Sequence, residues 1–521
     1  MAQVEEGQTL DANLLPTSTE DIVTTGDFSF NPKNNPFKAL VFSVEPIKFL
    51  TSVSEFSISA RTLTSKRFWF FPSALDLSPS LPESEAVMVQ TRSFAPLPPI
   101  ASKPVFKLQL RPSNIPKRKT ALSKPDSVGI KTDPPVLASS LLPSDTAAAQ
   151  VAWKYINRNW NTSTGLVNAV EDYPWTTLWD QGSAILGIHA ARQLNIITPT
   201  EFKTRIELLL QTLKMLPLAS TGLPNKAYST RTAQMQTLDN APDPQGKSGW
   251  SVLDTARLLL SLHVVKTHYP EYKPQVNAIV ARWKLSQLVK DGWLQGGVPE
   301  ESRIIRVQEG RLGYEQYAAE SLKLWGIKAS KALSKPPITT VQIEGVRLNI
   351  DQRNLKNSGA SNHLTNDPYL FWGLELGWTE AVKPQVLKLL AVQRQRHKRT
   401  GILTAVNEDS LDRPPYFLYG SVYADGKPWN TQSASGKPAD HFKQFSTKAA
   451  FAWEALLPNE PYTKLLRNSA QSLINKNQGF FTGQFENQTP SVNTVLNVNT
   501  NAAVLESILF KARRSKPLIS P

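Results

Sequence analysis

The sequence has no cysteine, which excludes disulfide bonds, thiolate metal sites and cysteine nucleophiles. It has only 6 histidines, and no two of them have the spacing of an HExxH metal motif. Hydrophobic runs are short, and none approaches the roughly 20 residues that a membrane-spanning helix needs. We therefore expect no metal site, no other cofactor and no transmembrane segment.

The net charge of +15 is spread along the chain rather than gathered in one cluster. The densest basic group is PKRKT, at 116–120, within a proline-rich region. Diffuse basic residues are typical of a solvated surface, so we expect no nucleic-acid partner. The stretch MAQVEEGQTLDANLL lacks the apolar segment of a signal peptide, which predicts a cytoplasmic location by default and leaves export open if the true start lies upstream.

Proline and tryptophan divide the chain into two regions. Residues 1–143 hold 17 of the 39 prolines but only one of the 13 tryptophans, Trp69. Proline breaks both helices and central strands, so we expect 1–143 to be a mostly irregular N-terminal region and linker. Residues 144–515 are expected to form the folded domain.

Residues 144–515 read as two alternating kinds of helix. One kind is amphipathic and charged on one face, as in an outer layer. The other is rich in Ala, Gly and Ser, has few charges, and often begins with an aromatic or acidic residue. The amphipathic segments are 144–160, 200–216, 272–289, 379–397 and 459–475. The apolar segments are 176–194, 250–265, 313–326, 367–378, 446–457 and 498–512.

This alternation predicts an all-α fold, an (α/α)6 toroid with the apolar helices inside. The sixth outer helix is missing between 327 and 366, where ITTVQIEGVRLNI (338–350) predicts a short β-hairpin insertion. Links from inner to outer helices are short, whereas links from outer to inner helices are long. All the long loops should therefore lie on one face, together with the N-termini of the inner helices.

Aromatic and acidic residues gather at these predicted helix starts and loops, as expected for a site that binds sugars and cleaves glycosidic bonds with two carboxyl groups. The longest loop, 404–429, contributes Glu408 and Asp409. We predict Glu408 as the acid, with Asp409 as its first substitute, and Asp180 or Asp254 as the base. The predicted substrate-binding residues are Trp175, Trp179, Trp250, Tyr314, Glu315, Asp367, Tyr369, Glu375, Tyr416, Trp429 and Asn499.

Several segments resemble the bacterial, largely cyanobacterial, domain of unknown function 3131 family. They are WTTLWDQGSAILG, GYEQYAAESL, TNDPYLFWGLELG, VNEDSLDRPPYFLYGSVYADGKPW, STKAAFAWEAL and NTNAAVLESILFKA. The resemblance spans about 144–515 and implies a glucoamylase-like toroid distantly related to glycoside hydrolases. It does not imply a substrate.

The expected function is a glycoside hydrolase acting on a glucan or envelope polysaccharide. Two alternatives remain at this stage. One is a polysaccharide lyase on the same fold, which would use a Tyr or His base next to Arg or Lys, and Arg413 lies near three loop tyrosines. The other is a carbohydrate-binding or assembly scaffold without turnover. The sequence does not indicate the oligomeric state.

Overall fold

The structure is a computed structural model, and it describes residues 141–300, 303–334, 336–487 and 491–519. The prediction of an irregular N-terminal region falls almost entirely on 1–140, outside the described residues. No helix within the described residues is long and apolar enough to cross a membrane.

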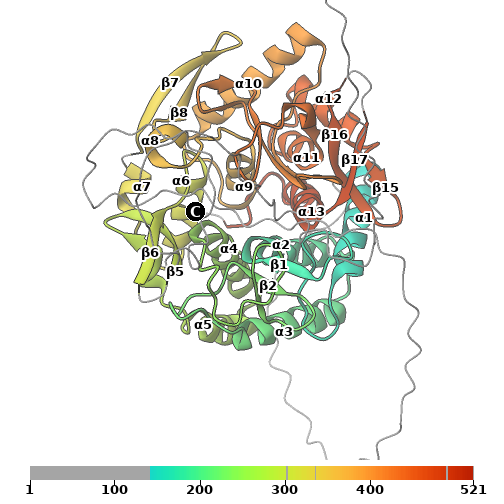
Figure 1. Cartoon of the computed structure of the whole chain (residues 1–521). Coiled ribbons are helices and arrows are strands. Elements are labelled where there is room, and N and C mark those ends of the chain that lie inside the picture. The colour runs from blue at the N-terminus through green and yellow to red at the C-terminus, as the bar shows by residue number, and fades with distance from the viewer. Residues whose placement is uncertain (1–140, 301–302, 335, 488–490, 520–521) are drawn as a thin grey trace, which may run out of the picture. The chain divides into compact units, whose positions relative to one another are not determined.

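Six helices pack against one another in a closed circuit, which we call the inner ring (Figure 1). In chain order each helix contacts the next, and the last contacts the first. They correspond to the six apolar segments of the sequence and are buried on nearly every side; in the first of them only Arg192 is not fully buried. The members are α2 (Leu178–Gln193), α4 (Val252–His268), α6 (Tyr314–Lys323), α9 (Asp367–Glu375), α11 (Thr447–Leu456) and α13 (Val498–Ala512).

Amphipathic helices lie outside this ring. Helix α3, for example, buries Phe202, Ile206 and Leu209 and exposes Lys203 and Lys214. Each of the five has a proline in its first turn, where the missing N–H costs nothing. They are α1 (Pro143–Asn159), α3 (Pro199–Met215), α5 (Lys273–Val280), α10 (Lys383–Thr400) and α12 (Pro461–Ala470). The third is shorter than predicted, because the backbone of Lys284 bonds to Gly222 and draws the chain toward the loops.

A hairpin stands where the sixth outer helix would be. After the short helix α7 (Ser330–Ser334), strands β7 (Ile338–Ile343) and β8 (Val346–Asp351) pair antiparallel around a Glu344–Gly345 turn with positive φ at both residues. This confirms the hairpin predicted at 338–350. The helix α8 (Leu355–Ser358) follows, and β8 packs on α10.

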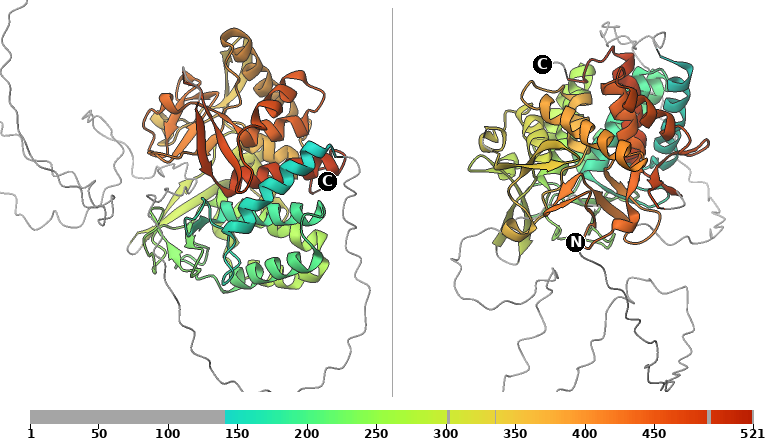
Figure 2. Two further views of the ribbon diagram at one scale, coloured as in Figure 1. Left: turned by 90° about the vertical axis from the view of Figure 1, so that its right-hand side faces the viewer. Right: turned by 90° about the horizontal axis from the view of Figure 1, so that it is seen from above.

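The predicted helices are present, and the long loops add small antiparallel sheets that the sequence analysis did not predict. These loops are largely buried, and buried backbone N–H and C=O groups need partners, which strand pairing supplies. The strands lie toward one side of the helices (Figure 2). Their bounds are β1 (Trp175–Thr177), β2 (Ala227–Ser229), β3 (Met235–Gln236), β4 (Val289–Lys290), β5 (Trp293–Glu300), β6 (Arg303–Gln308), β9 (Glu408–Ser410), β10 (Phe417–Gly420), β11 (Tyr423–Ala424), β12 (Lys427–Pro428), β13 (Thr431–Ser433), β14 (Gln444–Ser446), β15 (Ile474–Asn475), β16 (Gly479–Phe485) and β17 (Val492–Leu496).

The inner helices bring their first turns together. Asn499 of α13 donates to Asp180 of α2 at 2.7 Å. Asp367, the first residue of α9, contacts both Tyr314 of α6, at 3.4 Å, and Lys448 of α11, at 2.7 Å. We call this side the N-terminal end of the ring. Charged and polar side chains from distant parts of the sequence meet there.

Helix α1 also bears on where the folded domain begins. It starts at Pro143, and Leu141 before it packs against the core. We expect a chain that begins at Leu141 to keep its thermal unfolding transition nearly unchanged, because it keeps every described contact. Scanning calorimetry of the truncated and full-length proteins measures this. An insoluble or molten truncated chain would show that 1–140 supply part of the core.

Candidate active site

A lysine and two aspartates from three separate elements form the first cluster at the N-terminal end of the ring. Lys448 Nζ lies 2.7 Å from Asp367 Oδ2 and 3.8 Å from Asp409 Oδ1. Asn407, which precedes β9, fixes Asp367 by donating to its Oδ1 and accepting from its backbone N–H at 3.0 Å. All three charged side chains are buried.

The environment of Asp409 favours the protonated form of its carboxyl group. Burial raises the pKa of Asp409 to about 7; Lys448 opposes the rise and Asp367 adds to it. Lys448 lies closer to Asp367 than to Asp409, so its charge is mainly balanced by Asp367. A protonated Asp409 beside a Lys448–Asp367 pair leaves the cluster neutral. A carboxyl group with a raised pKa can act as a general acid near neutral pH.

The second cluster lies at the start of α4 and includes Lys226, Asp254 and Glu309. Glu309 accepts hydrogen bonds from Ser251 Oγ at 2.7 Å and from the backbone N–H of Val252 at 2.6 Å, and so caps the helix. Burial lowers the pKa of Lys226, and the charges of Glu309 and Asp254 oppose this. A buried ammonium group therefore stands near two buried carboxylates.

Asp180 lies at the N-terminal end of the ring and also caps helix α2. Its Oδ2 accepts from the backbone N–H and the hydroxyl of Thr177, at 2.9 and 2.8 Å, which completes a capping box. Its Oδ1 accepts from Asn499. Three hydrogen bonds to one carboxylate commit Asp180 to the helix start, which weakens it as a candidate for the base.

A buried charge network fills the centre of the inner ring below these clusters. Arg257 of α4 donates to Glu375 of α9 and Tyr317 of α6, and it contacts Glu506 of α13 at 3.3 Å. Tyr317 in turn donates to Glu375 at 2.6 Å. All four side chains are fully buried, so Glu375 is committed to this network rather than exposed to a ligand.

Most of the predicted aromatic binding residues are buried inside the protein. Trp175 and Trp250 are fully buried and donate their indole N–H groups to Thr237 O and Gln295 O, so they support the loops from within. Trp179 is 4% exposed and packs edge-on against Tyr314, inside the ring. Tyr369 is also buried, at 1% exposure.

The other predicted binding residues lie on or beside the loops. Glu315 is buried and paired with Arg353 at 2.7 Å. Trp429 donates to Glu344 of the β7–β8 turn at 3.2 Å. Tyr416 and Asn499 are half-buried, which leaves part of each side chain open to solvent.

Glu408 precedes Asp409 on β9, opposite Tyr419 of β10, and is also buried. Successive strand residues point to opposite faces, so Glu408 and Asp409 face different surroundings. Asp409 of this loop instead comes near Asp367 of α9, through Lys448, whereas the sequence analysis paired the loop with Asp180 or Asp254. The catalytic assignments themselves stay predictions.

Sequence reasoning missed Lys226, Glu309 and Lys448. Lys448 carried a usable signal, because it is a charged residue in the first turn of a helix that is apolar apart from Thr447 and Glu454. Lys226 and Glu309 lie in loops, and no pattern there indicates which helix start they meet. Within the described residues, no group of three His, Asp or Glu side chains is arranged to hold a metal ion.

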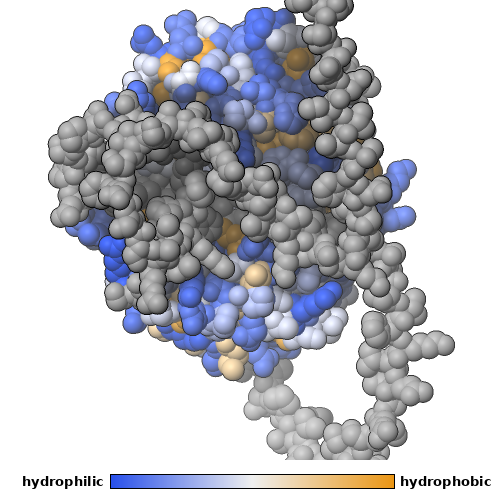
Figure 3. Space-filling model, in the orientation of Figure 1, coloured by the Kyte–Doolittle hydropathy of each residue, from blue (hydrophilic) through white to orange (hydrophobic). Residues whose placement is uncertain are grey.

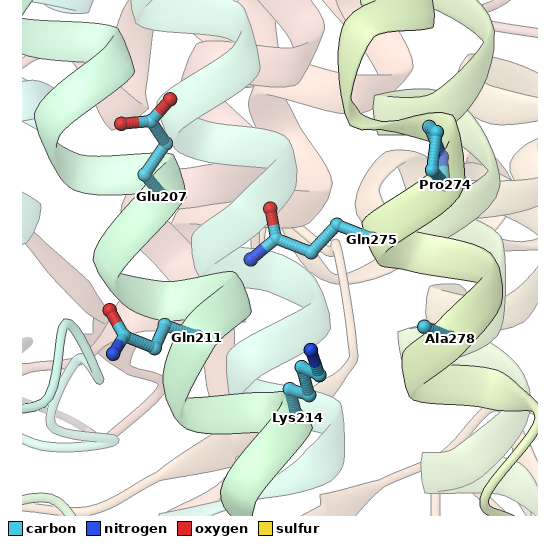
Figure 4. A pocket seen from close by; sticks show the side chains of 6 residues that line it. All are labelled: Glu207, Gln211, Lys214, Pro274, Gln275 and Ala278. Atoms are coloured by element: carbon cyan, nitrogen blue, oxygen red, sulfur yellow. The ribbon is translucent and has the colours of Figure 1, made fainter.

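The structure also has a groove of about 580 Å³ in the outer layer, between α3 and α5 (Figure 4). Its lining is mostly polar: Glu207, Gln211, Lys214, Pro274, Gln275 and Ala278. It lies between two outer helices rather than at the N-terminal end of the ring. We therefore place the candidate active site at the two lysine–carboxylate clusters.

The fold and site together define a helical-ring protein whose loops build an acidic, lysine-containing site at one end. The chain belongs to the family described as "Protein of unknown function (DUF3131)", which it matches over residues 147–514. This confirms the resemblance carried by the six sequence segments.

Several solved structures are similar to the chain at low sequence identity. An endo-β-1,2-glucanase from Chitinophaga pinensis is 13% identical with a TM-score of 0.49, covering 73% of this chain and 96% of that one. A candidate glucoamylase from Bacteroides caccae is 14% identical with a TM-score of 0.48, covering 72% and 97%. An endo-β-1,2-glucanase from Talaromyces funiculosus is 11% identical with a TM-score of 0.45, covering 71% and 86%. No curated protein matches the sequence.

Proposed function

We propose that this protein is a glycoside hydrolase acting on a glucan or envelope polysaccharide, with its active site at the N-terminal end of the ring. In this proposal the inner ring is the inner layer of an (α/α)6 toroid, and the β7–β8 hairpin replaces the sixth outer helix. The observation that carries the proposal is Asp409, a buried carboxyl group with a pKa of about 7 beside Lys448 and Asp367.

Asp409 is the general acid in this mechanism. Cleavage of a glycosidic bond needs one protonated carboxyl group at the leaving oxygen and one ionised carboxylate on the other side of the sugar ring. Asp409 is protonated in a large share of the molecules near neutral pH, because it is buried beside an already balanced pair. It can release that proton as negative charge develops on the leaving oxygen.

Asp254 is the proposed ionised partner. It lies in the first turn of α4, where the helix dipole favours negative charge, and the nearby Lys226 also favours the ionised form. Asp180, the other predicted base, already accepts three hydrogen bonds as a cap. The separation between Asp409 and Asp254 in a substrate complex would decide between retention and inversion of configuration.

Half-buried side chains of the loops supply contacts to the sugar. Tyr416 and Tyr423 keep part of their rings open, and aromatic faces stack on the C–H surfaces of sugars. The half-buried amide of Asn499 offers both a donor and an acceptor for hydroxyl groups.

Incubation of the purified protein with a polysaccharide panel tests the function. We expect new reducing ends from a neutral glucan, and no ultraviolet absorbance from unsaturated products, because hydrolysis creates no double bond. Glu408→Gln, next to the acid, is expected to lower the rate less than Asp409→Asn does. Products with ultraviolet absorbance would favour the lyase. Tight binding without either signal would favour a scaffold.

A further inference from the structure

We propose that Lys226 is a substrate-binding residue of this site and that the site takes a neutral glycan rather than a uronate-containing or otherwise anionic one. This inference rests on the proposed function, because it names the substrate class of the same site. It arises from a residue that sequence reasoning missed and from the balance of charges around it.

The backbone fixes Lys226 next to the start of α4. Its N–H donates to Gly249 O at 2.9 Å, and Gly249 comes two residues before Ser251, the N-cap of the helix. Gly249 cannot carry a side chain here: its φ is +72°, and a Cβ would lie 1.9 Å from Gly297 O. This tight approach holds the lysine near the carboxylates of Asp254 and Glu309, whose charges act on it.

The ammonium group of Lys226 has no partner of its own. It is 5% exposed, yet it forms no hydrogen bond and no ion pair within 4 Å in the part of the chain that the structure describes. Its Nζ is not fully enclosed, so water or a ligand hydroxyl can reach it and supply the missing hydrogen bonds. Lys448 differs, because it is held at 2.7 Å by Asp367.

The charge at the N-terminal end of the ring favours a neutral ligand. Five acidic side chains stand at the helix starts or contact them: Asp180, Asp254, Glu309, Asp367 and Asp409. Among the described residues, Lys226 and Lys448 are the lysines brought to these carboxylates. The neighbouring Glu315–Arg353 pair is balanced on its own. Acidic groups therefore outnumber lysines here although the whole chain is basic, and a polyanion would be repelled.

Sugar hydroxyl groups fit this arrangement because each can accept one hydrogen bond and donate another. A hydroxyl placed near Lys226 can accept from its ammonium group and donate to a nearby carboxylate. Hydrogen bonds to charged groups contribute about 1.5–3 kcal/mol each, enough for about a tenfold or greater effect on affinity. One lysine facing several carboxylates thus recognises a polyol without needing a charged substituent.

Binding measurements on the full-length chain test this inference. The probes are neutral glucose oligosaccharides of several linkages and hexagalacturonate as the anionic counterpart. They are measured by calorimetry in an Asp409→Asn background so that turnover does not interfere. We expect a neutral oligosaccharide to bind and hexagalacturonate not to bind. Lys226→Met should lower the affinity for the neutral oligosaccharide by about tenfold or more. Lys226→Arg should restore part of the lost affinity.

Lys247→Met is the matched control, because Lys247 is exposed and lies in the same loop as Lys226. Lys247→Met should leave the affinity for the neutral oligosaccharide unchanged. The thermal unfolding transition of each variant shows whether that variant folds. Unchanged affinity in Lys226→Met, preferred binding of hexagalacturonate, or no binding of any neutral oligosaccharide would each overturn the inference. Lys226-dependent binding of a neutral glycan that wild-type protein does not cleave would uphold it and reject the hydrolase proposal alone.

Discussion

Replacing Asp409 by asparagine is expected to lower turnover by about 10²–10⁴-fold, the usual contribution of a general acid, and at the same time to stabilise the fold at alkaline pH. Asparagine has nearly the shape of a protonated aspartate but has no proton to give. Turnover is expected to fall while stability at alkaline pH rises, so a damaged fold cannot explain both effects. Initial rates on the substrate found in the panel measure the first effect, and thermal melts at several pH values measure the second.

The sign of the stability effect follows from the pKa of Asp409. In the unfolded chain it ionises near its ordinary pKa of 3.8, whereas in the folded protein it stays protonated until about pH 7. The folded state therefore binds more protons between these values, and stability falls as pH rises through this window. The loss is complete above pH 7 and amounts to about 4 kcal/mol, an amount that Asp409→Asn avoids. Activity that depends on protonated Asp409 should also decline above pH 7.

Asp412 provides the matched control in the same loop. Burial alone raises its pKa, but Arg413 and Thr494 outweigh burial and hold the pKa below its ordinary value. Its contribution to stability is present above its unfolded pKa and is lost as pH falls through the folded one. Asp412→Asn should thus destabilise the protein slightly at neutral pH and leave turnover intact. Full activity in Asp409→Asn would remove Asp409 from the mechanism.

Much of the fold could be predicted because the residue composition of each helix indicates whether it is buried on all sides or exposed on one face. The segment that became α6 is small and apolar on most sides, and the structure buries all of it except Glu320 and Lys323. Segments with one charged face, such as α3, became outer helices. The β7–β8 hairpin was visible for the same local reason, since β-branched residues flank a Glu–Gly turn.

The small sheets and the site were harder to predict because they depend on contacts between distant segments. Strands such as β9 have only three residues, too few for a period-2 pattern to appear in the sequence. Glu408 and Asp409 were both sound candidates from their position in the longest loop. Only the packing of Lys448 and Asp367 against one of them distinguishes the two, and those residues lie 39 and 42 positions from Asp409 along the chain.

A second large effect is expected from Arg257 at the centre of the ring. Burial alone lowers its pKa, but Glu375, Tyr317 and Glu506 together raise the pKa above its ordinary value. Burial, and then the charge of Glu375, raises the pKa of Glu506. One guanidinium group thus contacts buried glutamates of two other helices. Its Nε also donates to Ser183 Oγ, which donates to Asn499, which donates to Asp180. The network therefore ties the ring centre to its N-terminal end.

Arg257→Met is expected to destabilise the protein by about 3–5 kcal/mol, because it leaves two buried glutamates without their cation. The loss should grow as pH rises, since low pH lets the glutamates take up protons. Arg257→Met combined with Glu375→Leu and Glu506→Leu should recover much of the stability, because well-packed apolar groups can replace a buried ionic cluster. Denaturant unfolding measures both variants, with Arg413→Met as the control for an exposed arginine in an ion pair. A loss in Arg257→Met no larger than in this control would mean that the central network does not hold the inner ring together.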